Sequence, residues 1–459
     1  MKRLRELDLG LVAVAAGLWC GLLVFLPSEL SPDGWYAFLG GDVIVHHGLP
    51  SHDTLTVWGH GRRWVDQQWL AQLAYYGLYA LGGLRLALLA NAAIVAGSFV
   101  AAVRLARFRN VYVAVAGGIA LGLSSAALRP QTLALPLFVA LAWLLVEDAR
   151  APSRRVFWAI PLLVLWANLH GTVTLGVLLV LLAVAADAWP RRRPTARTSL
   201  LAVLALASLF ASPYAPHLAG YYRTVLFNGE FAKYLPDWMP TALGPGTAAF
   251  YLLAFAAVFA IARAPSSLTL FEKASLIVLL VLAVEATRGV TWFILFALVV
   301  LPSAVRELQL PGVPLRSHLG GIVALVIAVV ASVVAASRPA SWFARDYPAP
   351  AAHVVAEEAG TNGAVFANGA FSDWLLLEEP SLRGRVAYDA RFEVLPDGRL
   401  ADAAAVSIGR YDAEQILRPF DVLALRPEET ELRETLEHDG RWRQVDADEK
   451  VVVLRRVTG

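Results

Sequence analysis

Long apolar runs repeat through the first three quarters of this 459-residue chain, and they constrain its fold more than any other feature. A helix needs about 20 mainly apolar residues to cross the hydrocarbon core of a bilayer. The chain is 58% hydrophobic and only 17% charged, whereas soluble proteins are roughly 45–50% apolar and about a quarter charged. We therefore expect an α-helical polytopic membrane protein.

Eleven runs qualify as spans, although several are short. They cover residues 9–27, 84–106, 111–127, 132–146, 156–169, 172–189, 198–211, 247–262, 274–286, 290–304 and 318–336. The first run follows a basic N-terminus, as a signal peptide does. It is too long for a typical signal-peptide core, and no small-x-small cleavage site follows it. We expect it to remain as the first span.

The segment 68–81 (QWLAQLAYYGLYAL) is apolar but only about 14 residues long, which is more typical of an interfacial or re-entrant helix. If it crossed the membrane, every later loop would change sides, so the distribution of Lys and Arg decides its placement. Without that crossing, the cytoplasmic loops carry 14 basic residues: Arg104, Arg107, Arg109, Arg150, Arg154, Arg155, Arg191, Arg192, Arg193, Arg197, Arg263, Lys273, Arg306 and Arg316. Among the loops after this segment, those on the opposite side carry four: Arg129, Arg223, Lys233 and Arg288. We therefore predict a multi-pass protein of the inner or plasma membrane, with a cytoplasmic N-terminus and an extracytoplasmic C-terminal part.

Residues 338–459 have the charge density of a soluble domain, and a Pro- and Ala-rich hinge near 338–352 joins them to the membrane domain, residues 1–337. Expected strands are 364–367, 386–388, 422–425, 443–445 and 450–454, and expected helices lie near 352–359, 372–378 and 429–438. This alternation predicts a small α/β domain. The single cysteine, Cys20, lies in the first apolar run, so the domain is expected to be stable without an intrachain disulfide. It has no Gly-rich nucleotide-binding motif.

Unusual polar residues gather in the turns that this threading places outside. The first outer loop, 28–67, contains Asp33, Asp42, His46, His47, His52, Asp53, His60 and Asp66. Later outer turns contribute Arg129, Asn168, His170, Asp237, Glu285 and Arg288. Ionisable groups at membrane depth are costly and usually face a bundle interior or a wet cavity. One shared cavity explains the gathering; interfacial caps and snorkelling anchors are the alternative.

Individual residues allow two interpretations each. Asp33, beside aromatic residues just after the first span, is a candidate general base or a cap of the following amphipathic helix. Arg288 can pair with Glu285 three residues earlier, or it can bind phosphate through its planar guanidinium. Asp66 and Gln68 flank tryptophans typical of an interfacial belt, and their role stays open. The loop histidines lack the spacing of a zinc site.

Several short motifs together resemble the GT-C glycosyltransferases, and in particular a large bacterial group of GT-C-like membrane proteins. In the first loop they are residues 31–36 (SPDGWY), 48–53 (GLPSHD) and 64–70 (WVDQQWL). An Arg-Pro pair follows at 129–130, then WANLHG at 166–171 and DARFE at 389–393 in the C-terminal part. The resemblance therefore covers nearly the whole chain, although each motif is short.

The resemblance implies inverting transfer of a sugar from a polyprenyl-phosphate donor to a glycan or lipid acceptor on the extracytoplasmic side, with Asp33 as the base. Arg129, His170 or Arg288 would steady the phosphate by charge-assisted hydrogen bonds, and the other expected substrate-binding residues are Asp66, Gln68, Asn168 and Asp237. The first acid of the family's paired motif is Ser31 here. We therefore expect no metal held by two carboxylates and no cofactor. In the C-terminal part, Asn368, Asp373 and residues 389–393 lie where a site could form, but a structural or lid role is preferred.

Two further function classes remain open. One is a non-catalytic membrane protein that binds or moves a lipid-linked glycan. The other is a secondary transporter, whose mark would be broken helices in two repeated halves; the sequence shows no convincing internal repeat. Nucleic-acid binding is not indicated, since the net charge is only +2 and no basic patch is interleaved with aromatic residues.

Overall fold

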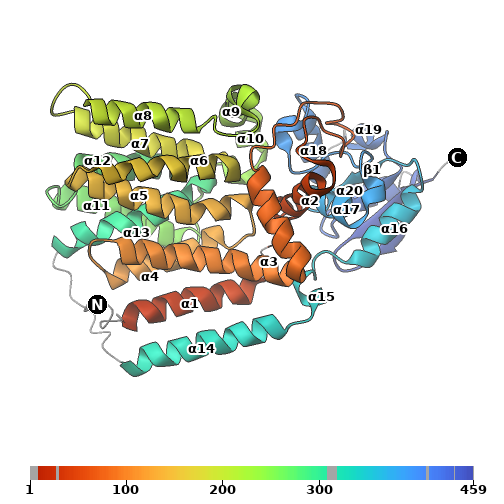
Figure 1. Cartoon of the computed structure of the whole chain (residues 1–459). Coiled ribbons are helices and arrows are strands. Elements are labelled where there is room, and N and C mark those ends of the chain that lie inside the picture. The colour runs from red at the N-terminus through yellow and green to blue at the C-terminus, as the bar shows by residue number, and fades with distance from the viewer. Residues whose placement is uncertain (1–8, 27–29, 308–317, 410–412, 439, 458–459) are drawn as a thin grey trace.

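A bundle of long helices carries a small α/β part at one end (Figure 1). The computed structural model describes residues 9–26, 30–307, 318–409, 413–438 and 440–457; the basic residues before Leu9, Ser28 of the outer loop and Arg316 fall outside these ranges. The helices that follow the predicted spans are α1 (Leu9–Phe25), α3 (Trp69–Leu105), α4 (Val111–Ser125), α5 (Leu135–Arg150), α6 (Ala159–Leu169), α7 (Val173–Ala188), α8 (Ala196–Ser208), α11 (Ala248–Arg263), α12 (Leu270–Glu285), α13 (Val290–Glu307) and α14 (His318–Ser337).

The apolar content of these helices confirms the helical membrane class. Four helical segments are long and apolar enough to cross a bilayer by length and composition: Trp69–Leu105, Pro130–Arg150, Thr287–Glu307 and Gly320–Ser337. Five others are apolar but shorter. Each predicted run contains a helix, but the count of eleven crossings and their orientation stay predictions.

Helix α13 is the centre of the bundle, and α14 is its edge. Every residue from Val290 to Val305 is buried, which is the behaviour of a helix that is apolar on all sides and surrounded by others. Helix α14 packs along α1 and leaves its outward face exposed, including Val326, Val330 and Val333. That face is apolar, as lipid contact requires.

A break inside α3 separates residues 69–81 from the membrane helix that follows. Gly83 has a φ of 63° and a ψ of −165°, a backbone conformation that residues other than glycine rarely adopt. The N-terminal part of α3 slants across the end of the bundle, and the remainder runs along it (Figure 1). The break therefore gives the short segment its own direction; that it does not cross the membrane stays a prediction.

The first outer loop begins with helix α2 (Pro32–His47), whose N-cap is Ser31. The Ser31 hydroxyl accepts a hydrogen bond from the amide of Gly34 at 3.3 Å and donates one to the carbonyl of Leu128 at 2.9 Å. The interpretation of Asp33 as the cap of this helix is therefore wrong. Asp33 lies in the first turn, and its carboxylate is left for other contacts.

The C-terminal part is built on a four-stranded sheet with the order β1-β2-β4-β3. Strand β1 (Val365–Ala367) runs parallel to β2 (Val422–Leu425), and β4 (Val452–Arg456) runs antiparallel to both β2 and β3 (Trp442–Ala447). Around it lie α15 (Ala340–Phe343), α16 (Ala349–Ala359), α17 (Ser372–Glu378), α18 (Arg399–Ser407), α19 (Ala413–Leu417) and α20 (Thr430–His438). The predicted strand 386–388 is wrong, since Val386 makes only isolated bridges to Val365 and Thr56.

The outer loop and the C-terminal part are joined by specific contacts. The amides of Val57 and Trp58 donate to the carbonyls of Val386 and Ala387 at 2.8 and 3.0 Å. The Trp58 ring stacks on Tyr388 with centroids 5.3 Å apart. These contacts hold the C-terminal part over the loop, and so over the end of the bundle where Asp33 lies.

Candidate functional site

Four separate turns meet at the end of the bundle that lies under the C-terminal part. They are the start of α2, the start of the 3-10 helix Pro130–Ala134, the 3-10 helix Pro236–Trp238, and the 3-10 helix Thr287–Gly289. Each supplies one charged residue of the predicted site: Asp33, Arg129, Asp237 and Arg288 respectively. The proline after Arg129 and the proline before Asp237 fix the backbone at the points where these side chains emerge.

Arg129 bridges two carboxylates. Its Nε lies 3.5 Å from Oδ2 of Asp33, and its Nη1 donates to Oδ2 of Asp237. The side chain of Arg129 is 26% exposed, and those of Asp33 and Asp237 are 43% and 42% exposed. The three groups therefore pair with one another and still remain open to an incoming ligand.

Arg288 completes the charged group. Its guanidinium lies over the ring of Trp238, 4.0 Å from the centroid. The described Arg288 side chain therefore contacts Trp238 and does not form the local ion pair with Glu285. It lies within electrostatic range of Asp33, Arg129 and Asp237. Two arginines from different turns therefore lie within electrostatic range of each other and of the same two carboxylates, and guanidinium groups are suited to binding phosphate.

The surroundings of Asp33 favour its neutral form. Desolvation by the surrounding protein raises the pKa of the Asp33 carboxyl, and the negative charge of Asp237 raises it further, while Arg129 and Arg288 oppose the shift. A carboxylate with a raised pKa is a better proton acceptor than an ordinary aspartate, because basicity and pKa rise together.

His170 lies at the junction of α6 and α7 and is held as a neutral imidazole. Burial lowers its pKa to about 3, with Arg288 and Arg129 contributing. The amide of Thr172 donates to Nδ1 at 3.2 Å, which leaves the proton on Nε2. His170 can therefore donate a hydrogen bond from Nε2, and its contact with a phosphate stays a prediction.

A second pair of acids lies between the loop and the C-terminal part. Burial raises the pKa of Asp66 to about 7 and that of Glu393 to about 7, and the negative charge of Glu393 adds to the shift of Asp66. Oδ1 of Asp66 accepts from Nε2 of Gln72 at 2.9 Å. Tyr36 and Tyr221 lie within electrostatic range of both acids. The charged cluster around Asp33 and this second pair of acids are neighbours, since Glu393 is also within electrostatic range of Asp33.

Glu393, Tyr221 and Trp238 are site neighbours that the sequence reasoning did not place. The signal for Glu393 was present in the DARFE stretch, for which a structural or lid role was preferred. Arg391 of the same stretch does take a structural role: it is 1% exposed and donates to Asp53 at 2.6 Å and to Asp389. Only the tertiary fold brings Glu393, more than 300 positions along, beside Asp66 and Asp33.

Asn168 and Gln68 lie at the edge of the site. Oδ1 of Asn168 accepts from Nε1 of Trp69 at 2.9 Å, and its Nδ2 donates to the carbonyls of Val164 and Ala211. These bonds join the end of α6 to the start of α3, which is a positioning role. Gln68 is the residue before α3, and no side-chain cap bond is formed there. Asn368, considered in the C-terminal part, donates to Glu429 at 2.8 Å.

Within the part of the chain that the structure describes, no group of three or more His, Cys, Asp or Glu side chains is placed to hold an ion. His46 of the loop instead contacts Asp42, with its Nδ1 3.1 Å from Oδ1.

Comparison with known proteins identifies the fold. No protein-family model and no curated protein matches the sequence. Among solved structures, the oligosaccharyltransferase AglB from Archaeoglobus fulgidus, in complex with an inhibitory peptide and dolichol-phosphate, is similar with a TM-score of 0.54 and 11% identity over 92% of this chain and 69% of that chain. ArnT from Cupriavidus metallidurans bound to undecaprenyl phosphate is similar with a TM-score of 0.52 and 14% identity over 97% of both chains; the apo form of ArnT matches over the same shares.

These structures define the architecture of the chain. AglB and ArnT are both GT-C glycosyltransferases, and this chain has the GT-C fold. The match over 97% of both chains means that the similarity to ArnT includes the bundle and the C-terminal part together. The resemblance drawn from the short motifs is thereby confirmed at the level of fold.

Proposed function

We propose that this protein is a membrane glycosyltransferase that moves a sugar from a polyprenyl-phosphate donor to a glycan or lipid acceptor, with inversion and with Asp33 as the general base. The observation that carries the proposal is the meeting of Asp33, Arg129, Asp237 and Arg288 from four turns at one end of a GT-C bundle. Such an open cluster of opposite charges has no evident structural purpose in a membrane protein.

The donor phosphate is assigned to the two arginines. Arg129 and Arg288 present guanidinium groups to one space, and His170 adds a neutral donor beside them. The similar structures of AglB and ArnT hold dolichol-phosphate and undecaprenyl phosphate. A phosphate that leaves gains negative charge, and donors that are already in place stabilise that charge without reorganisation.

The reaction is a single displacement at the anomeric carbon of the donor sugar. Asp33 takes the proton of the acceptor hydroxyl, and the hydroxyl oxygen forms the new glycosidic bond from the face opposite the phosphate. The bond between the anomeric carbon and the phosphate oxygen breaks, and polyprenyl phosphate leaves with the electron pair. Because attack and departure take place on opposite faces, the configuration inverts. Asp66 and Glu393 line the adjoining space and are assigned to the acceptor side.

The orientation of the protein belongs to the same proposal. Helix α2, whose first turn carries Asp33, lies at the same end of the bundle as the C-terminal part (Figure 1), so both are assigned to the same side of the membrane. The excess of Lys and Arg in the loops at the other end supports the assignment of the cluster to the extracytoplasmic side. The acceptor is then a component of the extracytoplasmic surface.

The variant Asp33→Asn tests the base directly. It keeps the size of the side chain and removes its basicity, so sugar transfer should fall by about 10³-fold. The measurement is release of polyprenyl phosphate from a panel of undecaprenyl-phosphate hexoses and pentoses, supplied to the purified protein with envelope glycans and lipids. Asp402→Asn, on the surface of the C-terminal part, is the matched control and should transfer as the wild type does.

Two results would contradict the proposal. Undiminished transfer by Asp33→Asn would remove this residue from the chemistry. Wild-type protein that binds the lipid-linked sugars and turns none of them over would instead support the non-catalytic carrier of lipid-linked glycans.

A further inference from the structure

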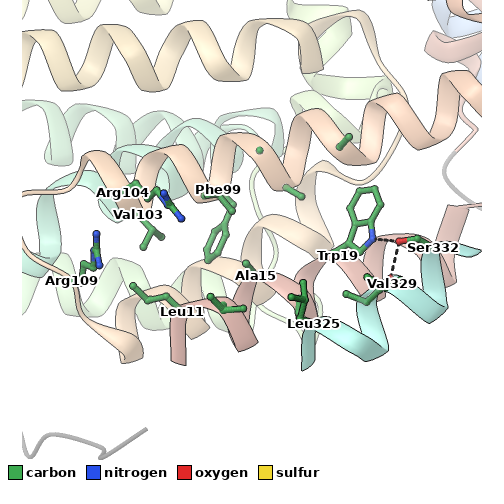
Figure 2. A pocket seen from close by; sticks show the side chains of 17 residues that line it. Leu11, Ala15, Trp19, Phe99, Val103, Arg104, Arg109, Leu325, Val329 and Ser332 are labelled. Carbon is green, nitrogen blue, oxygen red and sulfur yellow. Dashed lines mark hydrogen bonds between the residues drawn. The ribbon is translucent and has the colours of Figure 1, made fainter. Parts of the chain in front are cut away.

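A cavity of about 780 Å³ lies between α1, α3 and α14, away from the Asp33 cluster. Its walls are apolar and include Leu11, Ala15, Phe99, Val103, Leu325 and Val329 (Figure 2). Gly97 also lines it, and a Cβ added there would meet no atom within 4 Å. The three helices therefore leave an apolar space that their own side chains do not fill.

The two ends of this cavity differ in chemistry. Arg104, in the last turn of α3, and Arg109, just before α4, lie together at one end (Figure 2). Both side chains are exposed, and neither makes an ion pair with a described residue. At the other end, Nε1 of Trp19 donates to Oγ of Ser332 at 2.8 Å and ties α1 to α14. The space is thus cationic at one end and closed by a hydrogen bond at the other.

The length of the cavity matches one leaflet of a bilayer. Ala93 and Arg104 both line it and are separated by 11 positions on one continuous stretch of α3, which corresponds to about 16 Å at 1.5 Å per residue. Half of a hydrocarbon core of about 30 Å is about 15 Å. The arginines therefore lie near headgroup depth when the rest of the cavity lies among acyl chains.

We propose that this cavity binds an anionic glycerophospholipid of the leaflet opposite the C-terminal part. One acyl chain fills the space between α1, α3 and α14, and the phosphate contacts Arg104 and Arg109. Charge complementarity selects the headgroup, and the apolar walls select a lipid over a free phosphate, because water in this space would find few polar partners. The lipid completes the packing of α14, whose described contacts are made mainly with α1.

The headgroup contact is tested with the full-length protein in detergent, by native mass spectrometry with added phosphatidylglycerol, phosphatidylcholine or inorganic phosphate. Wild type should retain phosphatidylglycerol in preference to phosphatidylcholine. Arg104→Gln or Arg109→Gln should weaken that retention about fivefold each, and the double variant about 30-fold, at about 1 kcal/mol per arginine near the surface. Arg107→Gln is the matched control from the same loop, since Arg107 does not line the cavity and lies over Phe108.

The acyl contact is tested by filling the cavity. Gly97→Leu should reduce phosphatidylglycerol retention at least as strongly as the double arginine variant. Gly17→Leu, at an exposed position of α1 that has equal room and does not line the cavity, should leave it unchanged. If Gly97→Leu does not fold, the arginine variants decide the question.

Three results would overturn the proposal. The first is equal retention of phosphatidylglycerol by the wild type and the double arginine variant. The second is equal retention of phosphatidylcholine and phosphatidylglycerol, which would mean unselective filling by lipid. The third is tight binding of inorganic phosphate with no effect of Gly97→Leu on phosphatidylglycerol, which would identify a free-phosphate site.

Discussion

Two groups of the same composition, an arginine between two aspartates, lie in this molecule and behave differently. Arg391 lies between Asp53 and Asp389, with exposed fractions of 1%, 0% and 3%. Arg129 lies between Asp33 and Asp237, with exposed fractions of 26%, 43% and 42%. The first group joins the outer loop to the C-terminal part, and the second faces the space that we assign to the substrate.

The difference lies in how many hydrogen bonds the protein itself supplies. Asp53 also accepts from the amide of Leu55 at 2.9 Å and from the hydroxyl of Thr56 at 2.5 Å, so its charge is held entirely by protein groups. Among the residues that the structure describes, the carboxylate of Asp33 forms an ion pair with Arg129 at 3.5 Å. We call the buried Arg391 group closed and the partly exposed Arg129 group open. A closed group of charges stabilises the fold, because removal of one member leaves the others buried and unpaired. An open group keeps its capacity for a ligand.

The largest effect is expected from the closed group. Arg391→Gln leaves two buried aspartates without their cation and should lower the free energy of unfolding by about 3–5 kcal/mol. The measurement is thermal unfolding together with limited proteolysis of the C-terminal part. Arg455→Gln, which removes an exposed ion pair with Glu358, is the control and should change stability by at most about 1 kcal/mol. Equal effects of the two variants would break the comparison.

A smaller effect, on activity instead of stability, is expected from the open group. Arg129→Gln should reduce sugar transfer by about 10²-fold, because one preorganised donor to the leaving phosphate is lost. Its unfolding temperature should stay near that of the wild type, since half-exposed ion pairs contribute little. Arg129→Lys keeps the charge without the planar fork and should recover only part of the rate. A large loss of stability in Arg129→Gln would assign this arginine to the architecture as well.

The smallest effect concerns pH. Asp33 must be ionised to act as a base, so transfer is lost as the pH falls through its pKa. The negative charge of Asp237 raises that pKa, and Asp237→Asn should therefore move the loss of activity to lower pH. The shift should stay below about one pH unit, because both side chains are partly exposed. The acid limb of the pH–rate profile measures it, with Asp402→Asn as a control that should not shift.

Much of the architecture was predictable because it depends on local pattern. The helix of each predicted run is set by a stretch of apolar residues, and a helix is the conformation that satisfies such a backbone in lipid. The strands 364–367, 422–425, 443–445 and 450–454 were recognised for a related reason, as short apolar or alternating runs. Residues 386–388 gave the same signal, but their partners lie in the outer loop and at the edge of β1, so no ladder forms.

The site was predictable only in part. Asp33, Arg129, Asp237 and Arg288 stood out because charged residues in membrane turns are costly, and that argument needs no tertiary structure. The neutral state of His170 was not predictable, since it arises from burial and from two arginines that come from other turns. The role of Asn168 as a link between α6, α3 and the turn after α8 likewise depends on segments that meet only in the folded protein.

The sequence alone therefore determined that this is a bundle of apolar helices with charged turns and an α/β part, because those properties follow from composition and period along the chain. The tertiary structure decided which of the charges are closed and which are open. Arg391 and Arg129 each lie in a short motif of the sequence, and neither motif states whether its arginine is buried. The packing of the C-terminal part on the outer loop buries Arg391, whereas Arg129 stays partly exposed. Solvent access is what distinguishes a structural ion pair from a site.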